Sequence, residues 1–134
     1  SYPKAESLDL LVALSQEACN AYYPYLKKGG ILLIESELVK QPPTNQYLGL
    51  PFTSLAKDKI GIVQAMNTVV LGALSCLLPF INQATMRKSL EAVLPPKIRA
   101  VNTKAFNLGH RLAKKEWGED AGYVWRVEDE GEID

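Results

Sequence analysis

The sequence has little of the residue types that build metal centres and disulfide frameworks. Its 134 residues include one histidine and two cysteines, Cys19 and Cys76, which lie far apart in the chain. This count excludes a disulfide scaffold and a self-contained thiolate or iron–sulfur site, and it leaves little room for a histidine metal centre. Net charge is also absent, because fifteen basic residues balance fifteen acidic ones. A neutral chain argues against a dedicated nucleic-acid-binding protein, which normally needs a basic surplus.

Charged residues are missing altogether between positions 60 and 86. A run of this length is long enough to span a bilayer, which requires about 20 apolar residues. Polar Gln64, Asn67 and Thr68 lie inside it, and Pro79 interrupts it. We therefore predict a buried helix over about 63–78 and no membrane partner. Residues 1–9 lack the apolar run of a signal peptide, so we expect a cytoplasmic protein.

What is present is the alternating pattern of an α/β domain. Residues 8–14 form a continuous apolar run that is typical of a strand buried on both faces. Ser15 is predicted to cap a helix that runs to Lys28 and is stopped by Gly29 and Gly30. A second buried strand follows at 31–34. This strand–helix–strand order predicts a parallel sheet.

The rest of the chain reads mainly as helices. We predict a third strand over 47–50, a short helix capped by Thr53 or Ser54 and closed by Gly61, and further helices over 85–94 and 98–117. Met86, Leu90, Val93 and Leu94 are expected on one apolar face. Residues 1–118 are predicted to form one α/β domain, and 119–134 an acidic C-terminal tail.

Polar residues follow the first two predicted strands directly, as Ser15-Gln16 and Glu35-Ser36. The carboxyl ends of parallel strands line the ligand crevice of an open sheet, so these groups are candidates for facing a ligand or partner. Helix capping and an ordinary loop are the favoured interpretation, because caps are common and the spacing is not diagnostic.

Two asparagines and two glycines interrupt the apolar faces of two helices. Asn67 and Asn102 are expected to be hydrogen-bonded there, because a buried amide without partners costs roughly 1–3 kcal/mol. Gly72 and Gly109 lie inside helices, where close backbone approach is the expected reason for a glycine. We take these four residues as candidates for tight packing or for a subunit interface.

No catalytic set is visible in the sequence. His110 lies beside Arg111, without a nucleophile or carboxylate at a telling spacing, and is predicted to be a solvated histidine. Cys19 and Cys76 are predicted to be buried, inert thiols. Lys104, Arg111 and Lys114 form a stripe that we interpret as a solvated helix face.

The stretch LKKGGILLIE at 26–35 is similar to a structural turn that class I methyltransferases carry late in their sheet. The glycine-rich cosubstrate loop of those enzymes does not precede it here. A methyltransferase-like fragment is therefore one alternative, and a non-catalytic α/β interaction module is another.

The order of four segments carries a further resemblance. These are LDLLVALSQEACNAYYPYLKKGGILLIES from Leu8, PFTSLA from Pro51, AMNTVVLGAL from Ala65 and VNTKAFNLG from Val101. Together they resemble the gamma subunit of 2-oxoacid:ferredoxin (keto-acid:acceptor) oxidoreductases. The resemblance implies a three-layer α/β/α domain with a mostly parallel sheet, which here lacks its first strand–helix unit and the glycine-rich segment within it.

The resemblance also implies a function. Family members decarboxylate a 2-oxoacid such as pyruvate or 2-oxoglutarate oxidatively, form an acyl-coenzyme A and reduce ferredoxin. Thiamine diphosphate, iron–sulfur clusters and coenzyme A are expected on or between the other subunits, so this chain is expected to bind no cofactor itself. Alpha, beta and delta subunits are the implied partners, with ferredoxin reached through the complex. A sheet without its central strands exposes apolar edges, so self-association of the isolated chain is also expected.

Overall fold

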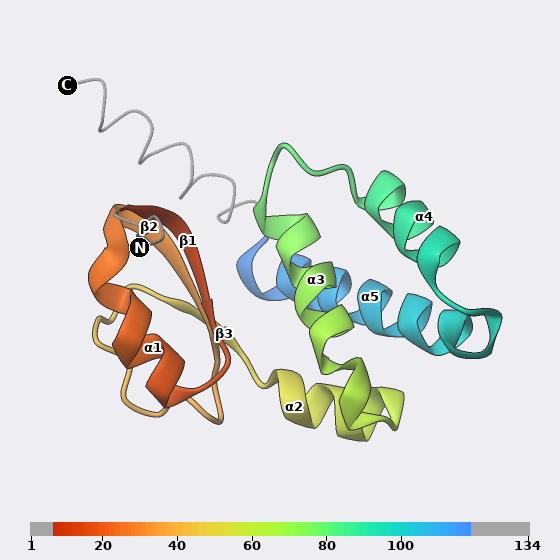
Figure 1. Ribbon diagram of the computed structural model, residues 1–134, viewed down its shortest axis with the longest axis horizontal. Helices are drawn as coiled ribbons and strands as arrows, with labels where there is room; N and C mark the ends of the chain where they lie inside the picture. Colours follow the sequence, from red (N-terminus) through yellow and green to blue (C-terminus); the bar gives the residue numbers. More distant parts are fainter. Residues whose placement is uncertain (1–6, 119–134) are drawn as a thin grey trace, which may run out of the picture. The chain divides into compact units, whose positions relative to one another are not determined.

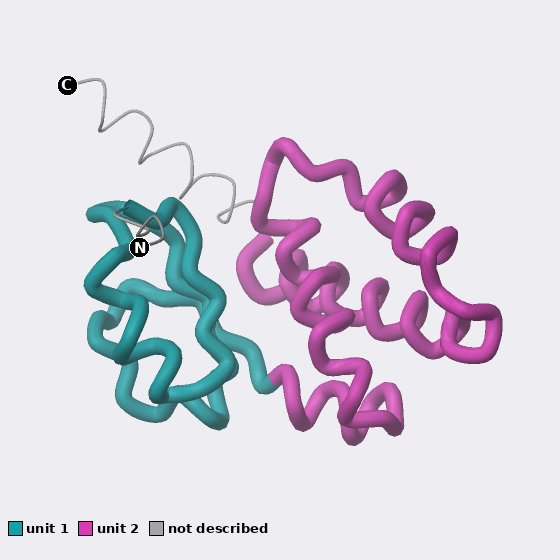
Figure 2. Tube along the Cα trace, in the orientation of Figure 1, with its two compact units in different colours: residues 1–51 teal, residues 52–134 magenta. Residues whose placement is uncertain are grey.

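A computed structural model describes residues 7–118, which belong to two compact units. The first unit covers residues 1–51 and the second residues 52–134 (Figure 2). The main elements, in chain order, are β1 (Leu8–Ala13), α1 (Gln16–Tyr22), β2 (Leu26–Glu35), β3 (Leu48–Leu50), α2 (Phe52–Leu55), α3 (Met66–Leu77), α4 (Gln83–Val93) and α5 (Pro96–Trp117) (Figure 1). The predicted acidic tail, 119–134, lies outside the described residues.

The first unit, which we call the sheet unit, is built on three parallel strands in the order β1-β2-β3. The central strand β2 pairs with β1 through Leu10↔Ile31 to Ala13↔Ile34, and with β3 through Leu33↔Leu48 to Glu35↔Leu50. Every residue of β2 from position 31 to 35 is buried, as expected for the central strand of a parallel sheet. The predicted α/β class and parallel sheet are confirmed.

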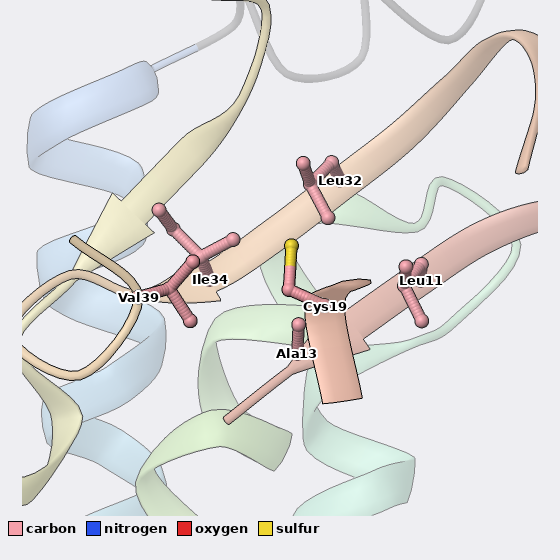
Figure 3. Close-up of a cluster of buried hydrophobic side chains, with 6 residues drawn as sticks. All are labelled: Leu11, Ala13, Cys19, Leu32, Ile34 and Val39. Carbon is pink, nitrogen blue, oxygen red and sulfur yellow. The ribbon is translucent and has the colours of Figure 1, made fainter. Parts of the chain in front are cut away.

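One cluster of buried side chains fixes α1 on this sheet. Alternate residues of a strand share a face, so Leu11 and Ala13 of β1 lie on one side together with Leu32 and Ile34 of β2. Figure 3 shows the fully buried Cys19 of α1 among these side chains. The cluster positions the start of α1 at the carboxyl end of β1, where Ser15 and Gln16 stand.

The first helix is much shorter than the sequence pattern predicts. It ends at Tyr22, and a single 3-10 turn over Tyr23–Tyr25 leads into β2, so the predicted extension to Lys28 is wrong. Pro24 is the reason, because proline has no backbone N–H with which to continue the hydrogen bonding of the helix. Gly29 does adopt the expected positive φ, of 83°, but it does so within the irregular first half of β2.

Helices make up the second unit, and we call its described residues, 52–118, the helical unit. The charge-free stretch forms a 3-10 turn at Val63–Ala65 and then α3, while α4 and α5 follow after Pro79. No helix among residues 7–118 has the length and apolar character needed to cross a bilayer. Pro96 begins α5 at a position where proline costs no hydrogen bond. Val93, which the spacing places on the apolar face of α4, leaves 78% of its surface exposed, so this end of the face is not covered within the described residues.

Candidate functional site

The polar groups at the carboxyl end of β1 bind the protein's own backbone. The Ser15 hydroxyl accepts a hydrogen bond from the N–H of Ala18 at 3.1 Å and caps α1. The Gln16 amide binds Gln41 twice, donating through Nε2 to its carbonyl and accepting through Oε1 from its N–H, both at 2.9 Å. These side chains therefore cap a helix and hold the loop after β2.

The polar group at the carboxyl end of β2 has a similar local role. Glu35 is fully buried, and its Oε1 accepts a hydrogen bond from the N–H of Glu37 at 2.8 Å. Its carbonyl accepts from Leu38 and Val39 at 3.2 and 2.9 Å, which closes the turn that leaves the sheet. The capping and loop interpretation of these residues fits this geometry, while Ser36 is left exposed.

The most constrained place in the helical unit is the crossing of α3 and α5. Gly72 of α3 and Gly109 of α5 are both buried there, and Figure 1 shows the two helices crossing. A Cβ atom at Gly72 would lie 2.0 Å from the carbonyl oxygen of Phe106, and one at Gly109 would lie 1.9 Å from that of Val69. Real Cβ atoms essentially never come within 3.0 Å of a heavy atom, so backbone meets backbone at this crossing.

A pair of polar side chains flanks the crossing on one side. Thr68 Oγ1 donates to Asn102 Oδ1 at 2.6 Å, and Asn102 Nδ2 donates to the carbonyl of Ile98 at 2.9 Å. The Asn102 amide is therefore hydrogen-bonded between the helices. The prediction that Asn67 sits in an apolar face is wrong, because its side chain is exposed. Successive residues of a helix point about 100° apart, and Thr68 rather than Asn67 faces α5.

A serine and the single histidine flank the crossing on the other side. Ser75 is buried, and its hydroxyl donates to the carbonyl of Gly72 at 2.6 Å. The same oxygen lies 3.0 Å from His110 Nδ1, so the ring donates its Nδ1–H and leaves Nε2 as an acceptor. Burial, with a smaller contribution from the charge of Lys114, lowers the pKa of His110. The predicted solvated histidine is therefore wrong, and the serine proton is held by a carbonyl rather than by the imidazole.

Both cysteines are free, and neither is activated. Burial raises the pKa of the fully buried Cys19 and of the half-buried Cys76, although the Lys114 charge opposes the shift at Cys76. A raised pKa keeps a thiol protonated and unreactive near neutral pH. Within residues 7–118, no group of three His, Cys, Asp or Glu side chains is placed to hold a metal ion. The described residues therefore do not fit an iron–sulfur cluster or a metal centre.

The outer side of α5 carries an open hollow of about 400 Å³. Ile60, Ala100 and Leu108 provide apolar lining, and Lys104, Asn107 and Arg111 provide polar lining. Lys104, Arg111 and Lys114 are all exposed, as the solvated-face prediction expects.

Thr68 and Ser75 are polar contacts between α3 and α5 that were not predicted from the sequence. A signal for them was available, because positions 68, 72 and 75 follow the spacing of a single helix face. Once Gly72 is placed against α5, Thr68 and Ser75 must face α5 as well.

Known proteins resemble this chain over most of its length. Residues 1–112 match the family described as Pyruvate ferredoxin/flavodoxin oxidoreductase. The 2-oxoglutarate synthase subunit KorC of Methanocaldococcus jannaschii is 33% identical over 118 residues, which covers 85% of this chain and 63% of that protein. The chain thus spans less than two thirds of the length of this curated relative.

Two solved structures share the fold. The gamma subunit of a keto/oxoacid ferredoxin oxidoreductase from Geobacter sulfurreducens PCA has a TM-score of 0.74 at 34% identity, covering 78% of this chain and 63% of its own. A 2-oxoglutarate:ferredoxin oxidoreductase from Magnetococcus marinus, solved with 2-oxoglutarate, coenzyme A and succinyl-CoA bound, has a TM-score of 0.68 at 25% identity. The match covers 80% of this chain and 20% of the Magnetococcus chain.

These matches support neither the methyltransferase-like alternative nor the interaction module. The matched residues include β1 to β3, the Gly72–Gly109 crossing and most of α5. The chain belongs to the pyruvate ferredoxin/flavodoxin oxidoreductase family.

Proposed function

We propose that this chain is the gamma component of a multi-subunit 2-oxoacid:ferredoxin oxidoreductase. Such an enzyme removes carbon dioxide from a 2-oxoacid, joins the acyl group to coenzyme A and passes the electrons to ferredoxin. The observation that carries the proposal is the likeness to the Geobacter gamma subunit, at a TM-score of 0.74 and 34% identity. The family match over residues 1–112 supports it.

In this proposal the chain is a structural component of a cytoplasmic complex and is inactive alone. Its partners are the alpha, beta and delta subunits, and ferredoxin meets the assembled enzyme. Thiamine diphosphate, iron–sulfur clusters and coenzyme A are held on or between those other subunits. Neither nucleic acid nor a membrane is a partner.

2-Oxoglutarate is the first substrate to test. The Methanocaldococcus relative is named as a 2-oxoglutarate synthase subunit, and the Magnetococcus enzyme was solved with 2-oxoglutarate and succinyl-CoA. Pyruvate and branched-chain or aryl 2-oxoacids are the alternatives, because the gamma pattern is shared among enzymes for all of them.

The test is capture of the complex through a tag on this chain, under anaerobic conditions. The eluate is assayed for viologen reduction that requires both coenzyme A and an added 2-oxoacid. We expect reduction with one oxoacid only, and none with the purified chain alone. The proposal would be wrong if the tagged chain captured no thiamine diphosphate enzyme while an active 2-oxoacid oxidoreductase remained in the unbound fraction.

The four packing candidates have different places in this assembly. Gly72, Gly109 and Asn102 lie within the contact of α3 with α5, whereas Asn67 faces outward near the start of α3. We infer that Asn67 contacts another subunit. Asn67→Arg should reduce the yield of captured partners while the chain keeps its unfolding midpoint, and Asn45→Arg, in an exposed loop of the sheet unit, is the matched control. Equal yields of captured partners with both variants would show that Asn67 does not contact another subunit.

A further inference from the structure

The neutral total charge of the chain conceals two strongly charged parts. The helical unit, residues 52–118, carries ten lysine or arginine side chains and only three aspartate or glutamate side chains. Residues 119–134 carry seven acidic side chains and one arginine. The surplus of seven positive charges in the first part is nearly matched by the surplus of six negative charges in the second.

Three of the ten basic side chains of the helical unit share one exposed face of α5. Lys104, Arg111 and Lys114 are spaced seven and three residues apart, which places them on one side of a helix, and all three are exposed. No ion pair joins them to any other residue in the described part of the chain. Lys114 is favoured by the negative end of the helix dipole, but Lys104 and Arg111 lie too far from the C-terminus for this explanation.

The hollow on α5 adds an apolar centre to this basic face. Lys104 and Arg111 lie about 10 Å apart along the helix axis. Leu108, which is buried, lies between them on α5, and Ile60 and Ala100 complete the apolar lining of the hollow. A complementary segment would therefore carry acidic groups on both sides of an apolar or aromatic group.

Residues 119–134 have this composition. Two acidic residues, 119 and 120, come first, the aromatic pair Tyr123 and Trp125 follows, and five more acidic residues lie between 128 and 134. We propose that the basic face of α5 (Lys104, Arg111, Lys114 and the hollow that the first two help to line) is the docking surface for residues 119–134 of the same chain. The aromatic pair occupies the hollow, and the acidic groups neutralise the lysines and the arginine.

The chain length permits this contact. The segment starts directly after α5, where Gly118 has a positive φ of 56° and its N–H caps the carbonyl of Lys114 at 2.7 Å. Lys104 lies about 20 Å back along α5 from Trp117. Position 128 lies nine steps along the chain from position 119, and this length of chain spans up to about 30 Å when extended. The second acidic group can therefore reach Lys104.

Fluorescence of Trp125 in the full chain tests the docking. The sequence has two tryptophans, so Trp117→Phe leaves Trp125 as the single reporter. At low ionic strength we expect Trp125 to be protected from acrylamide, a neutral quencher. At about 1 M sodium chloride the screening length falls to about 3 Å, so quenching should rise severalfold. Quenching equal to that of a free tryptophan amide at low salt would overturn the proposal.

Charge-reversal variants in the same background locate the surface. Lys104→Glu combined with Arg111→Glu should raise quenching at low salt to the high-salt level. The control pair Lys88→Glu and Lys97→Glu changes the charge equally at other exposed sites of the helical unit and should leave the protection intact. Unfolding midpoints confirm that each variant is folded. Protection that survives the first pair, or that is lost equally with the control pair, contradicts the proposal.

Dilution separates this contact from one between two copies. A segment that docks on its own chain does so at an effective concentration fixed by the linker, so about tenfold dilution should leave the protection unchanged. Protection that disappears on dilution would make a second copy the occupant and would overturn the proposal.

Discussion

Gly72 and Gly109 tolerate no side chain, and their substitution should destabilise the helical unit. Alanine at either position gains about 1 kcal/mol of helix propensity. Its Cβ, however, would meet a backbone oxygen at about 2 Å, and overpacking of this kind costs about 3 kcal/mol or more because a backbone cannot rotate away. We expect Gly72→Ala and Gly109→Ala each to lower the free energy of unfolding by about 2 kcal/mol or more, measured by urea titration.

The double variant provides the control for this prediction. Both substitutions separate the same two helices, so once α5 has been displaced by the first, the second should cost less. The loss in Gly72→Ala/Gly109→Ala should therefore be smaller than the sum of the single losses. If the two losses of unfolding free energy add exactly, the two clashes are relieved independently. That result would contradict the prediction, because both glycines lie at the same helix crossing.

His110 should make stability depend on pH near neutrality. Its pKa in the folded chain lies below the ordinary value of 6.5, so the unfolded chain binds a proton more readily. Stability is therefore fully present above about pH 6.5 and falls as the pH drops towards the folded pKa. Since His110 is the only histidine, no other histidine contributes in this window. Urea midpoints measured between about pH 5.5 and 8 should show the slope.

The comparison variant is His110→Asn, which keeps an amide N–H near the position of Nδ1 for the bond to Ser75. It should flatten the slope above about pH 6 without abolishing folding. A slope that persists in this variant would assign the pH dependence to other groups.

At the scale of the elements, the start of α1 depends on its N-cap residue, Ser15. The helix is only seven residues long, and the Ser15 hydroxyl satisfies one of its free N–H groups. Ser15→Ala should cost about 1 kcal/mol in the sheet unit, followed by chemical denaturation. Ser36→Ala, at the exposed position that follows β2, is the matched control and should change little. Equal losses of unfolding free energy in the two variants would show that the hydrogen bond from Ser15 to the N–H of Ala18 does not stabilise α1.

The elements themselves were largely predictable from the sequence. Unbroken apolar runs indicate β1 and β2, and helical periodicity indicates α3 and α5, because burial of these faces dominates the folding energy. The end of α1 differs from the prediction because Pro24, which removes one backbone N–H, stops the helix although the apolar and lysine pattern continues beyond it. A local covalent restriction overrode a correct periodicity there.

The polar contacts around the crossing were harder to predict. Asn67 and Thr68 are adjacent, and a difference of one residue turns the side chain by about 100°. The side chain that points towards α5 is determined by where Gly72 packs against the α5 backbone. A single sequence does not specify that point of contact. His110 was misjudged for the same reason, since its position beside Arg111 is visible in the sequence but its bond to Ser75 is not.

For the whole molecule, the open edge of the sheet is the feature that bears on association. The strand order places β1 at one edge, and among the described residues no strand pairs with its outer side. Its residues alternate between buried Leu11 and Ala13 and half-buried Leu10 and Val12. An unpaired strand of this apolar composition is a template for pairing with another chain.

We therefore expect the isolated chain to associate with itself through β1 in a concentration-dependent manner. In sedimentation velocity, the weight-average mass should rise with protein concentration. Leu10→Lys should reduce this rise, because two copies paired along β1 would bring like charges together, at up to about 1 kcal/mol for each facing pair. Leu38→Lys makes the same chemical change at a position that is 51% exposed in the turn after β2, and it should leave association unchanged. If the unsubstituted chain sediments as a monomer at every concentration, the β1 edge does not mediate association. If both lysine variants suppress the rise in mass equally, association depends on the net charge of the chain and not on β1.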